Sequence, residues 1–324
     1  EGIRNAIGEL RLPKGTTPVL AAAMTIAGDA TTSLFQPLFS PDGSHLAYAS
    51  DTRGWSNVWL YNLRDNRHSC LTEDERDVGL PAWIQGLRTM SFSANGKRLY
   101  FTRSEAGCRR AYVCEIETRE ISEVTELAGY TSIEQLTAAP RGLSLACIAS
   151  SGTIPPRIVR AEATTVSISS RSSSETIPAA ELSEPRPLSW KAGDGREVHG
   201  LYYAPASTRF TGSGAPAAIV SVHGGPTSQA KCGFDARNQF FATRGYAVLD
   251  INYRGSTGFG RAYAQLLRGN WGVLDVEDAF GGGQHLVDSG LANESQLIIM
   301  GGSAGGYTTL KALTDRPGFF RAGI

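Results

Sequence analysis

The stretch LIIMGGSAGGYTTLKAL, residues 297–313, constrains the fold most, because it places one serine among four glycines. The apolar run that ends at Met300 predicts a buried strand, and YTTLKAL, residues 307–313, predicts a helix. Between them, residues 301–305 fit the pattern G-x-S-x-G, in which a sharp turn holds the serine hydroxyl outward. Such a turn strains the serine backbone, and neighbours with side chains would clash. The sequence therefore predicts a strand, a tight corner at Ser303 and a helix.

Apolar strands alternate with helix-length segments through the second half of the chain. Continuous apolar strands are predicted at AAIVSVHGG (217–225), YAVLDINYRG (246–255) and SQLIIM (295–300). Helices are predicted between them, at 235–243 and 273–290. Buried strands separated by helices form a parallel or mixed sheet covered on both faces. This half is predicted to be a doubly wound, mostly parallel sheet.

Two smaller features of this half also carry expectations. The segment 187–205 predicts a β-hairpin that turns at Asp194-Gly195. The triplet Gly281-Gly282-Gly283 lies inside a predicted helix, where each glycine costs about 1 kcal/mol relative to alanine. We therefore expect a weak or kinked helix at the triplet.

The first half of the chain repeats itself. FSPDGSHLAYASDTRGWSNVWLYNL (39–63) and FSANGKRLYFTRSEAGCRRAYVCEI (92–116) align at a constant offset of 53, and a weaker third copy occupies 139–162. Alternating strands bounded by Asp-Gly or Asn-Gly turns, recurring every ~40–50 residues, indicate β-propeller blades. Propellers close with about four to eight blades. With three copies and a partial blade in 1–38, we expect an internal fragment of a longer protein.

These patterns divide the chain into three parts. Residues 1–165 are predicted to be a partial β-propeller of about three blades. Residues 166–186, rich in Ser, Thr and Pro, are predicted to be a linker with a short strand at 164–169. Residues 187–324 are predicted to be the N-terminal part of the α/β domain. Both domains are expected to be incomplete.

Composition excludes several classes of protein. The chain has 31 basic and 31 acidic side chains, so its charge gives no reason to expect nucleic acid or an anionic membrane surface as partner. No apolar run reaches the roughly 18 residues of a membrane span. The five cysteines are scattered and lack a C-x-x-C pair, which predicts reduced thiols, no zinc site and a cytoplasmic location.

The residues around the corner indicate acyl-transfer chemistry. Backbone N–H groups at the start of the helix after Ser303 face a developing oxyanion. VHGGP, residues 222–226, also follows a strand, so the amides near Gly224 and Gly225 supply a second donor. Glycine suits a backbone that approaches the substrate closely, and Pro226 fixes the exit of the turn.

The base is expected elsewhere. Where the nucleophile lies on such a corner, the catalytic groups follow the order Ser, then Asp or Glu, then His. His223 and His199 both precede the serine and do not fit this order, and His223 is predicted to be a structural residue that braces its loop. No histidine follows Ser303, and Asp315 is too close in sequence to orient a base. The triad Asp and His are therefore expected beyond residue 324.

Several motifs carry a resemblance to a known family. SVHGGPTS, INYRGSTGFGRAYAQ, WGVLDVEDA and GGSAGGYTTL resemble the hydrolase domain of the prolyl oligopeptidase family of serine peptidases, in its acylaminoacyl-peptidase and dipeptidyl-peptidase-like branch. The resemblance implies an α/β-hydrolase fold preceded by a β-propeller that caps the active site. It also implies that Ser303 is the nucleophile and that the amides of Ala304 and Gly225 form the oxyanion hole. Tyr253 and Arg254, at the end of a strand, would line the substrate site, and the alternative is that they are packing residues at the strand terminus.

The resulting hypothesis is a serine peptidase that hydrolyses short peptides through an acyl-enzyme on Ser303. No metal or organic cofactor is implied, and the partners expected are short peptide substrates, with self-association left open. The enzymatic alternative is an esterase of the same fold. The other alternative is a non-catalytic module in which the propeller recognises a partner and the fragment is inactive, since removing the base collapses most of the rate.

Overall fold

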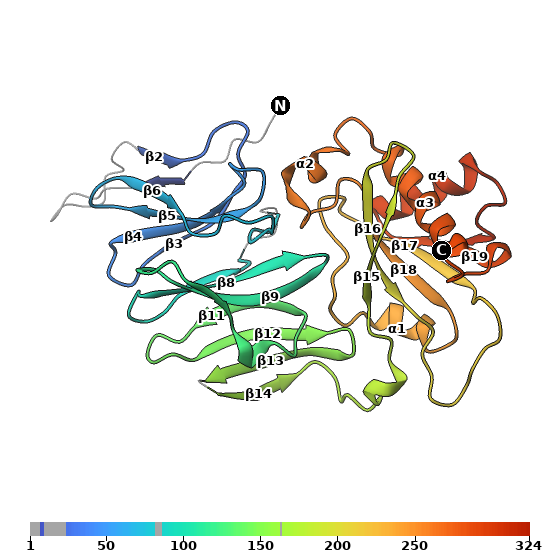
Figure 1. The fold of residues 1–324 in the computed structure, drawn as a ribbon, viewed down its shortest axis with the longest axis horizontal. Coiled ribbons are helices and arrows are strands. Elements are labelled where there is room, and N and C mark those ends of the chain that lie inside the picture. Colours follow the sequence, from blue (N-terminus) through green and yellow to red (C-terminus); the bar gives the residue numbers. More distant parts are fainter. Residues whose placement is uncertain (1–6, 10–23, 82–85, 163) are drawn as a thin grey trace.

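The computed structural model describes residues 7–9, 24–81, 86–162 and 164–324, in two halves that lie side by side (Figure 1). The first half is built of antiparallel β-strands, drawn from blue to green. The second half, from yellow to red, is a sheet with helices on both faces. The architecture is an incomplete β-propeller followed by a partial α/β-hydrolase domain.

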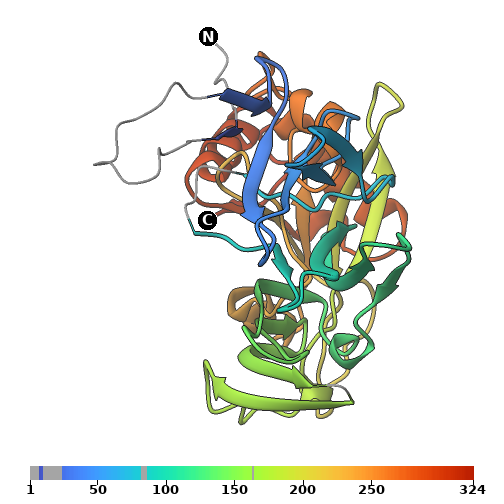
Figure 2. The same cartoon turned by 90° about the vertical axis from the view of Figure 1, so that its left-hand side faces the viewer.

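The first complete blade is a four-stranded antiparallel sheet. Its strands run in the order β3 (Leu34–Phe39), β4 (His45–Ser50), β5 (Asn57–Asn62) and β6 (Arg67–Cys70). Along β4 and β5 the side chains alternate between two apolar clusters, so both faces of this sheet are packed. In Figure 2 this blade and the third one lie at opposite ends of the β half.

Two further blades share one eight-stranded sheet. One contains β7 (Met90–Phe92), β8 (Arg98–Glu105), β9 (Cys108–Glu115) and β10 (Ile121–Glu123). The other contains β11 (Ser132–Ala138), β12 (Leu145–Ser151), β13 (Ile154–Glu162) and β14 (Thr165–Arg171). A single parallel pairing of Ser132 with Arg109 joins the two. The predicted repeat is confirmed, because Leu46 of β4 and Leu99 of β8, 53 positions apart, occupy equivalent strands.

The ends of the first half differ from the simple division drawn from the sequence. A two-stranded sheet of β1 (Ile7–Glu9) and β2 (Met24–Ala27) precedes the first blade, and the remainder of the expected partial blade before residue 24 lies outside the described residues. Strand β14 pairs along its length with β13, so the segment expected to be a linker begins with a blade strand. The division at 1–165, 166–186 and 187–324 stays our proposal, and the segment from residue 172 to 185 contains one short 3-10 helix, Ala179–Glu181.

The second half contains a six-stranded mixed sheet. Its order is β15 (Arg186–Lys191), β16 (Glu197–Tyr203), β18 (Ala247–Asn252), β17 (Ala218–Val222), β19 (Leu297–Gly301) and β20 (Ala322–Gly323). Strands β15 and β16 form the predicted hairpin with its turn at Asp194-Gly195 and pair antiparallel. Strands β17 to β20 pair parallel. The carboxyl ends of β17, β18 and β19 therefore meet at one edge of the sheet.

Helices cover both faces of this sheet. Helix α1 (Ala236–Ala242) packs on one face, whereas α3 (Leu274–Asp288) and α4 (Ala304–Asp315) pack on the other, and the short α2 (Gly260–Gln265) lies beside the propeller (Figure 1). Helix α3 runs unbroken through Gly281–Gly283, so the expected kink is absent. A Cβ on Gly282 would lie 3.1 Å from the ring of Trp190 and 3.0 Å from Leu249. The missing side chains let the helix approach the sheet closely.

The cysteines differ from the prediction of five reduced thiols. Cys108, at the start of β9, forms a disulfide with Cys232, which lies in the loop between β17 and α1. The link joins the propeller to the α/β domain across 124 positions of sequence. Cys70, Cys114 and Cys147 are free thiols.

Among the residues described, no helix is long and apolar enough to cross a membrane.

Candidate active site

The corner predicted from the glycine-rich motif lies at the carboxyl edge of the sheet. Strand β19 ends at Gly301, and α4 begins at Ala304. Ser303, between them, has φ 54° and ψ −122°, a backbone conformation that a non-glycine residue adopts at a cost. Its side chain is exposed. The strained strand-to-helix corner therefore presents the hydroxyl outward.

Close packing explains two of the three glycines in residues 301–305. A Cβ on Gly301 would stand 2.3 Å from the carbonyl oxygen of Gly305, and a Cβ on Gly305 would stand 2.1 Å from that of Val222. Both distances are far below van der Waals contact, so neither position accepts a side chain while the corner keeps its shape. Gly302 has open space around it. The motif thus packs β19, α4 and the end of β17 together by backbone contact.

The second glycine turn lies directly beside the serine. It follows β17, and a Cβ on Gly224 would be 3.2 Å from the Cβ of Ser303. Gly225 has φ +134°, a conformation that favours glycine. The N–H of Ala304 belongs to the first turn of α4, where helix amides lack intrahelical acceptors. The structure therefore brings Ser303, Ala304 and the turn with Gly224 and Gly225 together.

His223 braces this turn, as predicted. Its Nδ1 lies 2.9 Å from the carbonyl oxygen of Gly224, and its Nε2 lies 2.8 Å from Oγ of Ser256. The first contact requires Nδ1–H to donate, so Nε2 accepts from the hydroxyl. Burial lowers the pKa of the His223 imidazole to about 4. The ring is therefore neutral at neutral pH, with both of its nitrogens engaged.

Tyr253 and Arg254, expected to line the substrate site, are both buried. The ring of Tyr253 stacks on that of His223, and its hydroxyl donates to the His223 carbonyl oxygen at 3.3 Å. Arg254 is 1% exposed, and its guanidinium bonds Asp194, Glu277 and Asp278 at 2.7–3.1 Å. These carboxylates direct Arg254 into the fold, where it joins the β15–β16 turn to α3. Tyr253 supports the glycine turn from beneath.

A cavity between the two halves opens next to the glycine turn. Its volume is about 390 Å³, and the residues that follow Gly225, namely Pro226 and Thr227, line it from the α/β side. The propeller lines the opposite side with a mixture of apolar and acidic side chains, Phe35, Asp51, Asp77, Leu80 and Pro81. A crevice between domains is a common location for ligand sites, and this one begins at Pro226, the residue after Gly225.

Two features at this interface are missing from the sequence prediction. Asp77, in the propeller, accepts hydrogen bonds from the N–H of Ser56 at 2.7 Å and of Gly260 at 2.9 Å, so one carboxylate bridges both domains. The disulfide between Cys108 and Cys232 is the other. Neither has a local sequence signal, because each joins residues more than one hundred positions apart. Within the described ranges, no group of three or more His, Cys, Asp or Glu is arranged to hold a metal ion.

The segment that carries the corner is similar to known proteins. Residues 232–324 match the model of the prolyl oligopeptidase family. A dipeptidyl peptidase family member 6 of Caenorhabditis elegans is 45% identical over 109 residues, which are 33% of this chain and 14% of that protein. An acylamino-acid-releasing enzyme of Arabidopsis thaliana is 32% identical over 146 residues, 45% of this chain and 18% of that protein.

A solved relative extends the likeness over both halves. The structure of a puromycin-hydrolyzing peptidase of Mycobacterium tuberculosis superposes with a TM-score of 0.87 at 33% identity and covers 94% of this chain. This chain covers 47% of that one, so it spans about half the length of the solved relative. The superposition therefore includes both the β half and the α/β half of this chain. Residues 232–324 thus match the prolyl oligopeptidase family, and the whole chain is similar in fold to a solved peptidase.

Proposed function

We propose that this chain carries the nucleophile and oxyanion hole of a serine peptidase that cleaves short peptides through an acyl-enzyme on Ser303. The observation that carries the proposal is the strained backbone of Ser303, at φ 54°, directly beside Gly224. Strain of this kind persists only where the surrounding structure enforces it, and it collects at functional sites. Here it holds a hydroxyl next to the backbone of the glycine turn and of the first turn of α4.

The amides supply the electrostatic part of the mechanism. Attack of Ser303 Oγ on a carbonyl carbon places negative charge on the carbonyl oxygen. In the proposed arrangement the N–H of Ala304 and the N–H of Gly225 donate to that oxygen. Donors that are already in place pay no reorganisation cost, and the loss of one typically slows acyl transfer by about 100- to 1000-fold.

The base that activates Ser303 belongs, in this proposal, to residues beyond 324, together with the acid that orients it. The histidines within the chain have other partners. Both ring nitrogens of His223 are hydrogen-bonded, and His199 stacks on Phe259 with the ring centroids 4.5 Å apart. We therefore expect negligible turnover from residues 1–324 alone.

The substrate is proposed to enter between the propeller and the α/β domain. The cavity of about 390 Å³ beside Pro226 admits a few residues of extended peptide and excludes folded proteins. Similar proteins include puromycin hydrolases, at 28–33% identity. We propose amide bonds of short peptides and of aminoacyl amides as the substrate class, with nucleic acid and membranes outside it and self-association left open.

The compartment is a separate proposal. The sequence predicts the cytoplasm, whereas the Cys108–Cys232 disulfide favours an oxidising compartment, because cytosolic thiols are kept reduced. Mass spectrometry of the protein alkylated in intact cells separates the two. A linked Cys108–Cys232 peptide favours the oxidising compartment, and two alkylated thiols favour the cytoplasm.

The nucleophile is tested with a fluorophosphonate probe, in a polypeptide that joins this chain to the segment supplying the base. We expect labelling of the parent, none after Ser303→Ala, and full labelling after the control Ser295→Ala, whose exposed side chain lies at the opposite end of β19. Labelling that persists unchanged in Ser303→Ala refutes the proposal. Turnover of acyl esters without any turnover of peptide anilides assigns the site to an esterase instead.

A further inference from the structure

The loop that carries the glycine turn lacks regular secondary structure. Between the end of β17 at Val222 and the start of α1 at Ala236, the chain forms neither helix nor strand. A loop of this length samples many conformations unless it is tied down. The position of Gly225 beside Ser303 therefore depends on what holds this loop.

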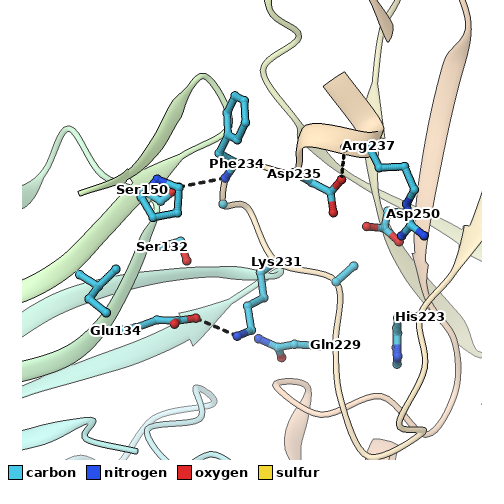
Figure 3. A pocket seen from close by; sticks show the side chains of 14 residues that line it. Ser132, Glu134, Ser150, His223, Gln229, Lys231, Phe234, Asp235, Arg237 and Asp250 are labelled. Carbon is cyan, nitrogen blue, oxygen red and sulfur yellow. Dashed lines mark hydrogen bonds and ion pairs between the residues drawn. The ribbon is translucent and has the colours of Figure 1, made fainter. Parts of the chain in front are cut away.

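The second part of the loop, residues 229–235, is called the docking segment here, because it lies against the propeller (Figure 3). At its centre, Cys232 is 1% exposed and disulfide-bonded to Cys108. The N–H of Cys232 donates to the carbonyl oxygen of Gly107 at 3.0 Å. Its own carbonyl oxygen accepts from Oγ1 of Thr131 at 2.6 Å. The side chain and both backbone groups of Cys232 are thus taken by the propeller.

Contacts on either side of Cys232 are polar and few. Nζ of Lys231 lies 2.8 Å from Oε1 of Glu134, and both groups are about half exposed, so this pair contributes little. The N–H of Phe234 donates to Oγ of Ser150 at 2.9 Å, as drawn in Figure 3. A cavity of about 320 Å³ remains between the docking segment and the blade strands. Nε2 of Gln229 also donates to Oγ of Ser104 at 3.3 Å. Among these contacts the disulfide is the covalent one.

Residues 226–228 of the same loop join the docking segment to the glycine turn, and hydrogen bonds hold this connection at both of its ends. Ala230 exchanges two bonds with the side chain of Asn252, at 2.7 and 3.3 Å. The N–H of Ser228 donates to the carbonyl oxygen of Pro226 at 2.7 Å, and Pro226 follows Gly225 directly. A displacement of the docking segment thus reaches Gly225 through the backbone of residues 226–228.

We propose that Cys108 and Cys232 are positioning residues for catalysis: their disulfide fixes the docking segment on the propeller and thereby holds the Gly225 amide at the oxyanion. The inference rests on the proposed function, because it concerns the same oxyanion hole. It gives the propeller a second role: besides covering the site, the propeller positions an amide of the oxyanion hole.

The first test uses the 324-residue chain and requires no activity. A digest without reductant should contain a peptide that links Cys108 to Cys232. Hydrogen exchange should then be compared between the oxidised chain, the Cys108→Ser/Cys232→Ser double variant and the control Cys70→Ser, whose thiol is free in β6. We expect faster exchange at residues 224–235 only in the double variant, with β17 and β18 unchanged.

Reduction of the folded chain covers the case in which the double variant does not fold. A phosphine converts the disulfide to two thiols and takes up oxygen from water as the phosphine oxide. The same acceleration of exchange at 224–235 should appear. The inference is overturned if the digest contains no peptide that links Cys108 to Cys232. It is also overturned if the exchange rate at residues 224–235 is the same with and without the disulfide.

The second test measures catalysis in the polypeptide that includes the base, below the unfolding transition of every variant. Loss of the disulfide should lower kcat by about tenfold to hundredfold, less than complete loss of an oxyanion donor, and leave KM within about twofold. Reoxidation of the reduced parent should restore kcat, and Cys70→Ser should match the parent. Unchanged kcat after loss of the disulfide refutes the inference and leaves the proposed function in place. Fluorophosphonate labelling that survives Ser303→Ala refutes the proposed function, and the exchange result stands on its own.

Discussion

The Cβ position of Gly305 lies 2.1 Å from the carbonyl oxygen of Val222, so the first turn of α4 rests directly on the last residue of β17. Through this contact the helix that follows Ser303 and the strand that precedes the glycine turn share one corner. This backbone contact sets the start of α4 against the end of β17, from which the glycine turn departs. A side chain at residue 305 would act on both.

Gly305→Ala is expected to destabilise the chain by about 1–3 kcal/mol, because its methyl group meets backbone atoms that have no room to retreat. The matched control is Gly306→Ala, one position along the same helix, where the nearest atom is 3.4 Å away. That control should gain up to about 1 kcal/mol from helix propensity. Urea unfolding measures both, and equal effects of the two substitutions would contradict the argument.

Asp278→Asn is expected to cost about 3 kcal/mol, because it removes the buried carboxylate that receives both the side chain and the backbone N–H of Arg254. Glu277→Gln serves as control. Glu277 also bonds Arg254, at 3.1 Å, but its side chain is 56% exposed, so its loss should cost less than about 1 kcal/mol. The difference between the two urea midpoints tests whether burial, and not charge alone, decides the contribution.

Asp77→Asn is expected to destabilise the chain by about 1–3 kcal/mol. The amide keeps a single acceptor oxygen, so the N–H of either Ser56 or Gly260 loses its partner inside the interface. Glu75→Gln, an exposed position nearby, should stay within about 0.5 kcal/mol of the parent. Thermal unfolding of the three proteins side by side provides the measurement, and a silent Asp77→Asn would show that the bridge contributes nothing.

The contribution of His223 to stability should fall as the pH decreases from 6.5 towards 4. In the unfolded chain an ordinary histidine takes up a proton near pH 6.5, whereas burial lowers the pKa of His223 in the folded chain to about 4. The largest loss this shift allows is about 3 kcal/mol, and partial exposure of the ring reduces it. Asp250 opposes the trend, since burial raises the pKa of its carboxyl to about 6.

The contribution of His223 is isolated by comparing the parent with His223→Gln over that pH range. The variant should lose the downward slope and keep the opposing contribution of Asp250. Parallel curves of stability against pH for the two proteins would show that the pKa of His223 is the same in the folded and the unfolded chain.

Much of the fold could be predicted from local pattern. The blade strands follow from period-two alternation and Asn-Gly or Asp-Gly turns, as in the strand pairs that contain Leu46 and Leu99. The corner at Ser303 follows from glycine on both sides of one hydroxyl. The expectation of a weak or kinked helix at Gly281–Gly283 came from helix propensity, which is a local quantity. It took no account of the ring of Trp190, against which the helix packs.

The amino-acid sequence alone was sufficient to predict the features that depend on residues within a few positions of each other: strand periods, tight turns and the strained serine. It also showed that no histidine follows Ser303. Tertiary structure alone decided the burial of Arg254 by three carboxylates, the bridge made by Asp77 and the pairing of Cys108 with Cys232. The physical reason is that adjacent residues determine the torsional and steric preferences of a short segment. Contacts across a hundred positions arise only when two separately folded surfaces meet.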